Sequence, residues 1–121
     1  MILHIIDEFS DIIHEYKIKK FRNFGALYEI NLQIFFIDKT TLYVRDYLFS
    51  DNIRKYSYHW QTEKGECIIR WDNIPHHQNI TTFPFHKHIG KKENVAESEA
   101  MSLGKVLGLI RNKISQVKDD V

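Results

Sequence analysis

The residues best suited to chemistry in this chain lie between Tyr56 and His88. Five of the seven histidines fall in that stretch, together with cationic, acidic and amide side chains. An imidazole changes charge between about pH 5 and 8, so it can donate or accept a proton near neutrality. The candidate catalytic residues are His59, Arg70, Asp72, His76, His77, His86, Lys87 and His88. The candidate substrate-binding residues are Tyr56, Tyr58 and Asn73.

Paired histidines suit the cleavage of a phosphodiester bond. One imidazole takes a proton from an attacking hydroxyl, while a second protonates the oxygen that leaves. The predicted base is His59 or His86. The predicted acid is His88 or His77. When the attacking group is a 2′-hydroxyl, the substrate is RNA, and the reaction requires neither a metal nor another cofactor.

Cations beside these histidines would hold the phosphate. Arg70 and Lys87 are predicted to stabilise the negative charge that develops on it. Asp72 is predicted to orient Arg70 or one of the histidines. Tyr56 or Tyr58 would stack on a base if an edge of its ring is exposed.

A metal-dependent nuclease or hydrolase is the first alternative. His86 and His88 would project alike on an extended chain. Asp72, with His76 or His77, could complete a ligand set of the kind that transition metals accept. The chain has no HExxH sequence or other spaced metal motif, so the prediction is a protein without a bound metal.

Hydrophobic periodicity places these residues in an α+β fold. A period of three to four predicts a helix over residues 1–16, and a period of two predicts strands after it. Short turns make neighbouring strands antiparallel, so we expect a meander sheet of four to five strands. The strands are predicted at 28–36, 42–48, 53–62 and 66–73, with a shorter one at 17–22.

Periodicity is lost between Ile74 and Lys92, which predicts a long histidine-rich loop. The loop holds both prolines and four histidines, and loops of this length are often functional. Proline restricts the backbone, so the imidazoles beside it are presented with less loss of entropy. Asn94 with Glu97 resembles a capping box and predicts the start of a C-terminal helix that packs on the sheet.

The hairpin formed by 53–62 and 66–73 fixes which side chains share a face. A two-residue turn at Lys64-Gly65 would pair Glu63 with Glu66. The pairs that follow are Trp60 with Ile69, Tyr58 with Trp71, His59 with Arg70 and Ser57 with Asp72. The core face would carry Tyr56, Tyr58, Trp60, Cys67, Ile69 and Trp71. The other face is polar, and a non-enzymatic interaction or regulatory module that docks a partner there is the second alternative.

Composition bounds the class of protein. A length of 121 residues suits one domain over residues 1–121, and a net charge of +1 gives no global attraction for nucleic acid. The single cysteine, Cys67, excludes an internal disulfide. No apolar run reaches eighteen residues, and the first residues lack the pattern of a signal peptide. We therefore expect a cytoplasmic protein without a membrane segment.

Three ordered motifs resemble those of the TumE family of prokaryotic toxins. They are YSYHW (56–60), RWDNIPHH (70–77) and FPFHKH (83–88). One departure is Ile74, where the family pattern has a small residue. The resemblance implies a small toxin that a cognate antitoxin neutralises in a protein complex. Many toxins of this size are ribonucleases, so RNA is the expected substrate, and a homodimer is left open as a further assembly.

Overall fold

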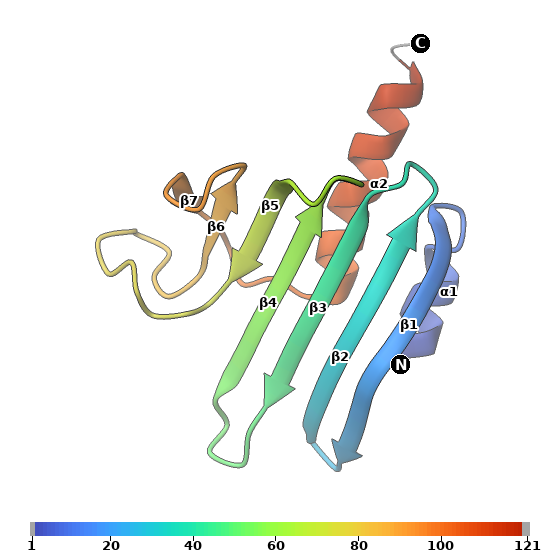
Figure 1. The fold of residues 1–121 in the computed structure, drawn as a ribbon. Coiled ribbons are helices and arrows are strands. Elements are labelled where there is room, and N and C mark those ends of the chain that lie inside the picture. The colour runs from blue at the N-terminus through green and yellow to red at the C-terminus, as the bar shows by residue number, and fades with distance from the viewer. Residues whose placement is uncertain (1, 120–121) are drawn as a thin grey trace.

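Alternating apolar and polar side chains build a seven-stranded antiparallel sheet in which the strands follow chain order (Figure 1). The computed structural model describes residues 2–119. Its elements are α1 (Ile2–Glu8), β1 (Ile13–Phe24), β2 (Leu27–Phe36), β3 (Thr41–Leu48), β4 (Arg54–Gln61), β5 (Cys67–Asp72), β6 (His86–Ile89), β7 (Val95–Glu97) and α2 (Leu103–Asp119). The α+β class and the meander are confirmed, but the prediction of four to five strands is wrong.

The two extra strands, β6 and β7, arise where the sequence predicted loop and helix. They have four and three residues, too few to show a period in the sequence. The side-chain amide of Asn94 donates to the Ile89 carbonyl (3.0 Å) and so closes a turn instead of capping a helix. The C-terminal helix begins at Leu103, where the Ser102 hydroxyl accepts a hydrogen bond from the Lys105 amide (3.3 Å).

The N-terminal helix is also shorter than predicted, because it ends at Glu8 instead of residue 16. The chain turns after Phe9, and the segment from Ile13 onward pairs with β2. Tyr16 lies opposite Ile34 in that pairing. Apolar residues at these positions fit both periods, and the pairing with β2 decides in favour of the strand.

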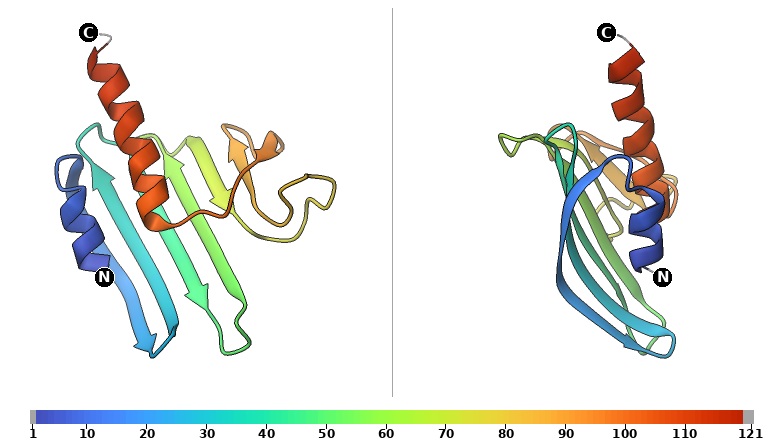
Figure 2. Two further views of the ribbon diagram at one scale, coloured as in Figure 1. Left: turned by 180° about the vertical axis from the view of Figure 1, so that it is seen from behind. Right: turned by 90° about the vertical axis from the view of Figure 1, so that its right-hand side faces the viewer.

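The core lies between the sheet and the two helices, both of which cover the same face (Figure 2). From α2, Val106, Leu107 and Ile110 are completely buried in this core. Burial of side chains of this type stabilises the fold by roughly 1.5–3 kcal/mol each. The predicted packing of the C-terminal helix on the sheet is therefore confirmed. Neither helix of residues 2–119 covers the opposite face of the sheet, here called the outer face.

The register of the β4–β5 hairpin is as predicted for all four pairs from Ser57 to Trp60, although the turn is different. The Thr62 amide donates to the Glu66 carbonyl (2.8 Å), so the loop has three residues instead of two. A three-residue loop alone would have exchanged the faces of β5. An extra residue in β5, Ile68, forms a bulge between two successive pairs and restores the predicted faces beyond it.

The bulge leaves Cys67 on the side away from the core. It pairs with Gln61, which precedes the bulge, and it is half-buried outside the core cluster. The prediction of a core cysteine is therefore wrong, whereas Tyr56, Tyr58 and Trp60 are buried as expected. Within residues 2–119, neither helix has both the length and the apolar character needed to cross a membrane.

Candidate functional site

Two rows of polar side chains cross the outer face, which is the face toward the viewer in Figure 1. Residues directly opposite each other on paired strands point to the same side, so the strand register defines the rows. The first row is Gln33, Tyr43, His59, Arg70 and His88. The second row is Asn31, Arg45, Ser57, Asp72 and His86. The hairpin and strand β6 thus bring histidines and cations from distant parts of the chain together.

A cleft of about 830 Å³ lies on this face over β3, β4 and β5. Its walls are both cationic and aromatic, and the segment 73–75 also lines it. The side chains that matter for chemistry are Tyr43, Arg45, Tyr47, Lys55, His59 and Arg70. Cations and aromatic rings side by side are what a single-stranded nucleic acid requires.

His59 is the histidine that lines the cleft. Burial, together with the positive charge of Arg70, lowers its pKa from the ordinary 6.5. Among the described residues, nothing forms a hydrogen bond to its buried Nδ1 atom. The ring of Tyr43 lies 6.5 Å away, centroid to centroid. His59 is therefore neutral near pH 7, which is the form that a proton acceptor needs.

Asp72 joins the cleft to a second group of side chains behind it. This carboxylate is only 2% exposed. Its Oδ2 accepts a hydrogen bond from Arg70 Nε (3.3 Å), and its Oδ1 accepts one from the Ile74 amide (3.1 Å). The Nε2 atoms of His86 and His88 lie 2.8 and 3.5 Å from the two carboxylate oxygens. Asp72 thus contacts Arg70 and two histidines.

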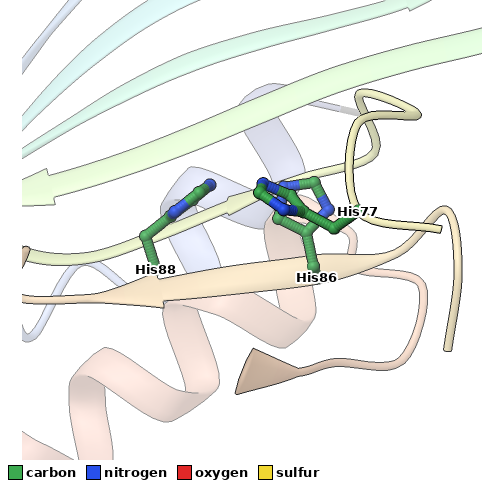
Figure 3. A group of neighbouring side chains, drawn as sticks. All are labelled: His77, His86 and His88. Atoms are coloured by element: carbon green, nitrogen blue, oxygen red, sulfur yellow. The ribbon is translucent and has the colours of Figure 1, made fainter. Parts of the chain in front are cut away.

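Three histidines, His77, His86 and His88, lie close together (Figure 3), and Asp72 contacts two of them. His77 reaches over from the loop, and its ring centroid lies 4.8 Å from that of His86 and 5.7 Å from that of His88. The loop returns to β6 through a cis Phe83–Pro84 peptide bond. Because His86 and His88 are 2% and 7% exposed, neither can contact a substrate as the structure stands.

Several predicted site residues lie elsewhere. His76 is exposed on the loop. Lys87 pairs with the core residue Trp71, so it points to the helix side of the sheet, away from the phosphate-binding position predicted for it. Tyr56 and Tyr58 are 3% and 0% exposed, which leaves neither ring free to stack on a base.

The remaining candidate, Asn73, borders the cleft but ties two strands together. Its side chain accepts from the Tyr56 amide (2.9 Å) and donates to the Arg54 carbonyl (2.7 Å). The oxygen and the nitrogen of the Asn73 side chain are therefore both bonded to the backbone of β4. This is a positioning contact at the end of β5.

The sequence interpretation missed a buried polar cluster on the helix side of the sheet. Asp46 accepts hydrogen bonds from Tyr58 (2.5 Å) and Tyr28 (2.9 Å), and both its oxygens accept from Arg54 (2.9 and 2.7 Å). The sequence did contain a signal for this cluster. Asp46 lies two residues after the core residue Val44 in β3, so it faces the same side of the sheet. The same alternation puts Tyr43 and Arg45 on the outer face, where they line the cleft.

Comparison with known proteins identifies the family. No curated protein and no solved structure matches the chain. A family model described as Toxin TumE matches residues 2–117, nearly the whole length. The family consists of toxins, which implies an antitoxin as partner. The chain therefore belongs to the TumE toxin family and is the toxin component of a toxin–antitoxin system.

Proposed function

We propose that this toxin is an endoribonuclease that cleaves RNA by proton transfer, without a metal ion at the reacting atoms. The observation that carries the proposal is the pairing of His59 with Arg70 across β4 and β5, on the cleft of the outer face. One residue supplies a neutral base and the other a fixed positive charge. Cleavage of a phosphodiester next to a 2′-hydroxyl needs both.

His59 acts as the base. It removes the proton from the 2′-hydroxyl, whose oxygen attacks the adjacent phosphorus while the bond to the 5′-oxygen breaks. The products are a 2′,3′-cyclic phosphate and a 5′-hydroxyl end. The lowered pKa of His59 supports this role, because it keeps the imidazole neutral near pH 7.

Arg70 stabilises the phosphate as its charge increases. The hydrogen bond from its Nε to Asp72 holds the side chain, while about a third of that side chain stays exposed toward the cleft. Arg45 and Lys55 also line the cleft and provide charge for the flanking phosphates. Preformed positive charge in the cleft supports the proposal, because the reaction would create negative charge on the phosphate.

Tyr43 supplies the proton to the leaving 5′-oxygen. Its hydroxyl oxygen accepts a hydrogen bond from Gln33 Nε2 (3.1 Å), which leaves its own hydrogen free to donate. The ring lies beside His59 on the same row. Tyr43 replaces the predicted acids His77 and His88, because His88 is buried and His77 packs against it.

The test compares His59→Ala and Tyr43→Phe with Tyr47→Phe, a second tyrosine of the cleft. Cleavage of a labelled RNA is expected to fall at least about 100-fold in the first two variants and to persist in the third. Growth arrest on expression should change in the same order. Wild-type cleavage by His59→Ala would remove the proposal.

The chemistry of the cut ends separates this proposal from its alternatives. Attack by the 2′-hydroxyl leaves a 2′,3′-cyclic phosphate, whereas a metal-activated water produces no cyclic end. RNA that stays intact with highly purified protein would indicate a non-enzymatic toxin. Mass spectrometry of the cut ends distinguishes all three outcomes.

A further inference from the structure

We infer that His77, His86 and His88 bind one divalent transition-metal ion, such as zinc, and that this ion fastens the loop between β5 and β6 to the sheet. This inference departs from the metal-free protein that the sequence predicted. It is independent of ribonuclease activity, because the ion would lie behind the cleft and not at the reacting atoms. The nitrogen atoms available as ligands lie within 4.8 Å of one another.

The ring orientations of His86 and His88 are those of metal ligands. His86 Nδ1 lies 3.0 Å from the Pro84 carbonyl oxygen, and His88 Nδ1 lies 2.5 Å from that of Lys92. A carbonyl oxygen only accepts, so each Nδ1 must carry its hydrogen. In histidines that bind metals, such a bond to the backbone fixes the tautomer and presents Nε2 to the ion.

The presented Nε2 atoms face a negative charge. That of His86 lies 2.8 Å from Asp72 Oδ1, and that of His88 lies 3.5 Å from Oδ2. A neutral imidazole has one N–H, already used at Nδ1, so its Nε2 lone pair would point at a carboxylate. A cation between these atoms removes the repulsion between the Nε2 lone pairs and the carboxylate oxygens. A single metal ion would do so for two histidines and Asp72 at once.

The spacing is close to that of an occupied site. Bonds of about 2.0–2.1 Å to a tetrahedral zinc ion hold the ligand atoms about 3.3 Å apart. The distances from Asp72 to both histidines already bracket this value. His77 lies on the loop and is half-buried, so a small movement of its side chain brings it into range. Nitrogen and carboxylate donors in this number suit zinc and similar ions.

The burial of the cluster determines what the ion would do. His86 and His88 are almost inaccessible, which excludes RNA from the ion and gives it a structural role. His77 is the one ligand from the loop, so binding ties the loop to β6. Ile74 and Pro75 of the same loop border the cleft, and Asp72 holds Arg70. The ion therefore positions one wall of the cleft.

The experiment titrates the chelator-treated full chain with Co²⁺, in the absence of RNA. We expect one ion per chain and the visible absorption of four-coordinate Co²⁺, displaced by Zn²⁺. His77→Ala should bind at least about 100-fold more weakly. Zinc should also protect the loop of the wild type, but not of His77→Ala, from limited proteolysis.

His76→Ala is the matched control, because this neighbouring histidine is exposed and lies outside the cluster. His76→Ala should bind the ion as the wild type does. His88→Gln is a second variant that removes a proposed ligand, in this case one on the sheet. Failure of the wild type to bind Co²⁺, or equal binding by His77→Ala, would overturn the site. So would loss of binding in His76→Ala. None of these results depends on whether the chain cleaves RNA.

Discussion

His59 lies between two strands that supply its immediate electrostatic neighbours, Tyr43 of β3 and Arg70 of β5. Burial and the charge of Arg70 both lower its pKa. A base works in its unprotonated form, so kcat/KM should stay constant near neutral pH. It should fall only as the pH drops below the lowered pKa, which is under the ordinary 6.5.

Substitution of Arg70 tests this electrostatic coupling. Arg70→Gln removes one of the two causes that lower the pKa of His59. The midpoint of the acidic limb of the pH–rate profile should therefore rise toward 6.5, in addition to a loss in rate from weaker phosphate stabilisation. NMR titration of the His59 ring gives the same shift without RNA. An unchanged midpoint in both measurements would show that Arg70 does not act on this imidazole.

Tyr58 was predicted to bind substrate, but its surroundings in the structure favour a role in stability. Its ring is fully buried and its hydroxyl donates to Asp46. Burial and the charge of Asp46 raise its pKa, so the hydroxyl keeps its hydrogen. Tyr58→Phe should lower the free energy of unfolding by about 1–3 kcal/mol and leave the rate of RNA cleavage unchanged. Denaturant unfolding measures the first quantity, with the exposed Tyr16→Phe as control.

Among the elements, the long strands were predictable and the short ones were not. Alternation over 28–36 and 42–48 located β2 and β3 to within one residue. Strand β6 forms because β5 offers it a partner edge, and β7 forms because β6 then offers the next edge, and no local pattern encodes either pairing. The capping residues Asn94 and Ser102 show the same limit, since either fits a helix start and packing selects one.

The candidate site was predictable to a similar extent. The pairing of His59 with Arg70 was predicted from an assumed two-residue turn, and it is correct because the three-residue loop and the bulge compensate each other. Lys87 could not be placed, because its face depends on the register of β6 against β5. The position of His77 beside His86 and His88 depends on how the loop folds back. The two prolines restrict that path but do not determine it.

Replacement of two glycines by alanine, one in a loop and one in a helix, should change the stability in opposite directions. Gly65 has a φ of +88° in the hairpin loop, where a side chain costs roughly 1–2 kcal/mol. Gly104 lies in the first turn of α2, and a Cβ there meets nothing within 4 Å. Gly65→Ala should therefore lower the melting temperature, whereas Gly104→Ala should raise the stability by up to about 1 kcal/mol. Calorimetry of both variants measures the two signs.

Over the whole molecule, a net charge of +1 conceals an uneven distribution. Arg45, Lys55 and Arg70 line the cleft, whereas Asp72 is buried behind it. Cations that contact phosphates release counterions from the nucleic acid, so RNA binding should weaken as salt increases. Local charge on the outer face thus replaces the global field that composition excludes.

Lysines on the two faces of the sheet provide a matched pair for this effect. Lys55→Ala removes a cleft cation and should reduce the slope of log affinity against log salt by about 0.7. Lys87→Ala removes the same charge from the helix side and should leave the slope unchanged. Fluorescence anisotropy with a short single-stranded RNA measures both. Equal slopes for the two variants would mean that RNA does not use the outer face.

The alternation of side chains in β3, β4 and β5 has a consequence for how such toxins diversify. In β4 every second residue belongs to the packed interior, and in β3 and in β5 beyond its bulge the same alternation holds for most positions, so the residues between them lie on the outer face. Point mutations at the exposed positions can therefore alter target preference while the scaffold persists. Insertion of a single codon within β4 would invert both sets together, so lineages should vary here by replacement and seldom by a change in length.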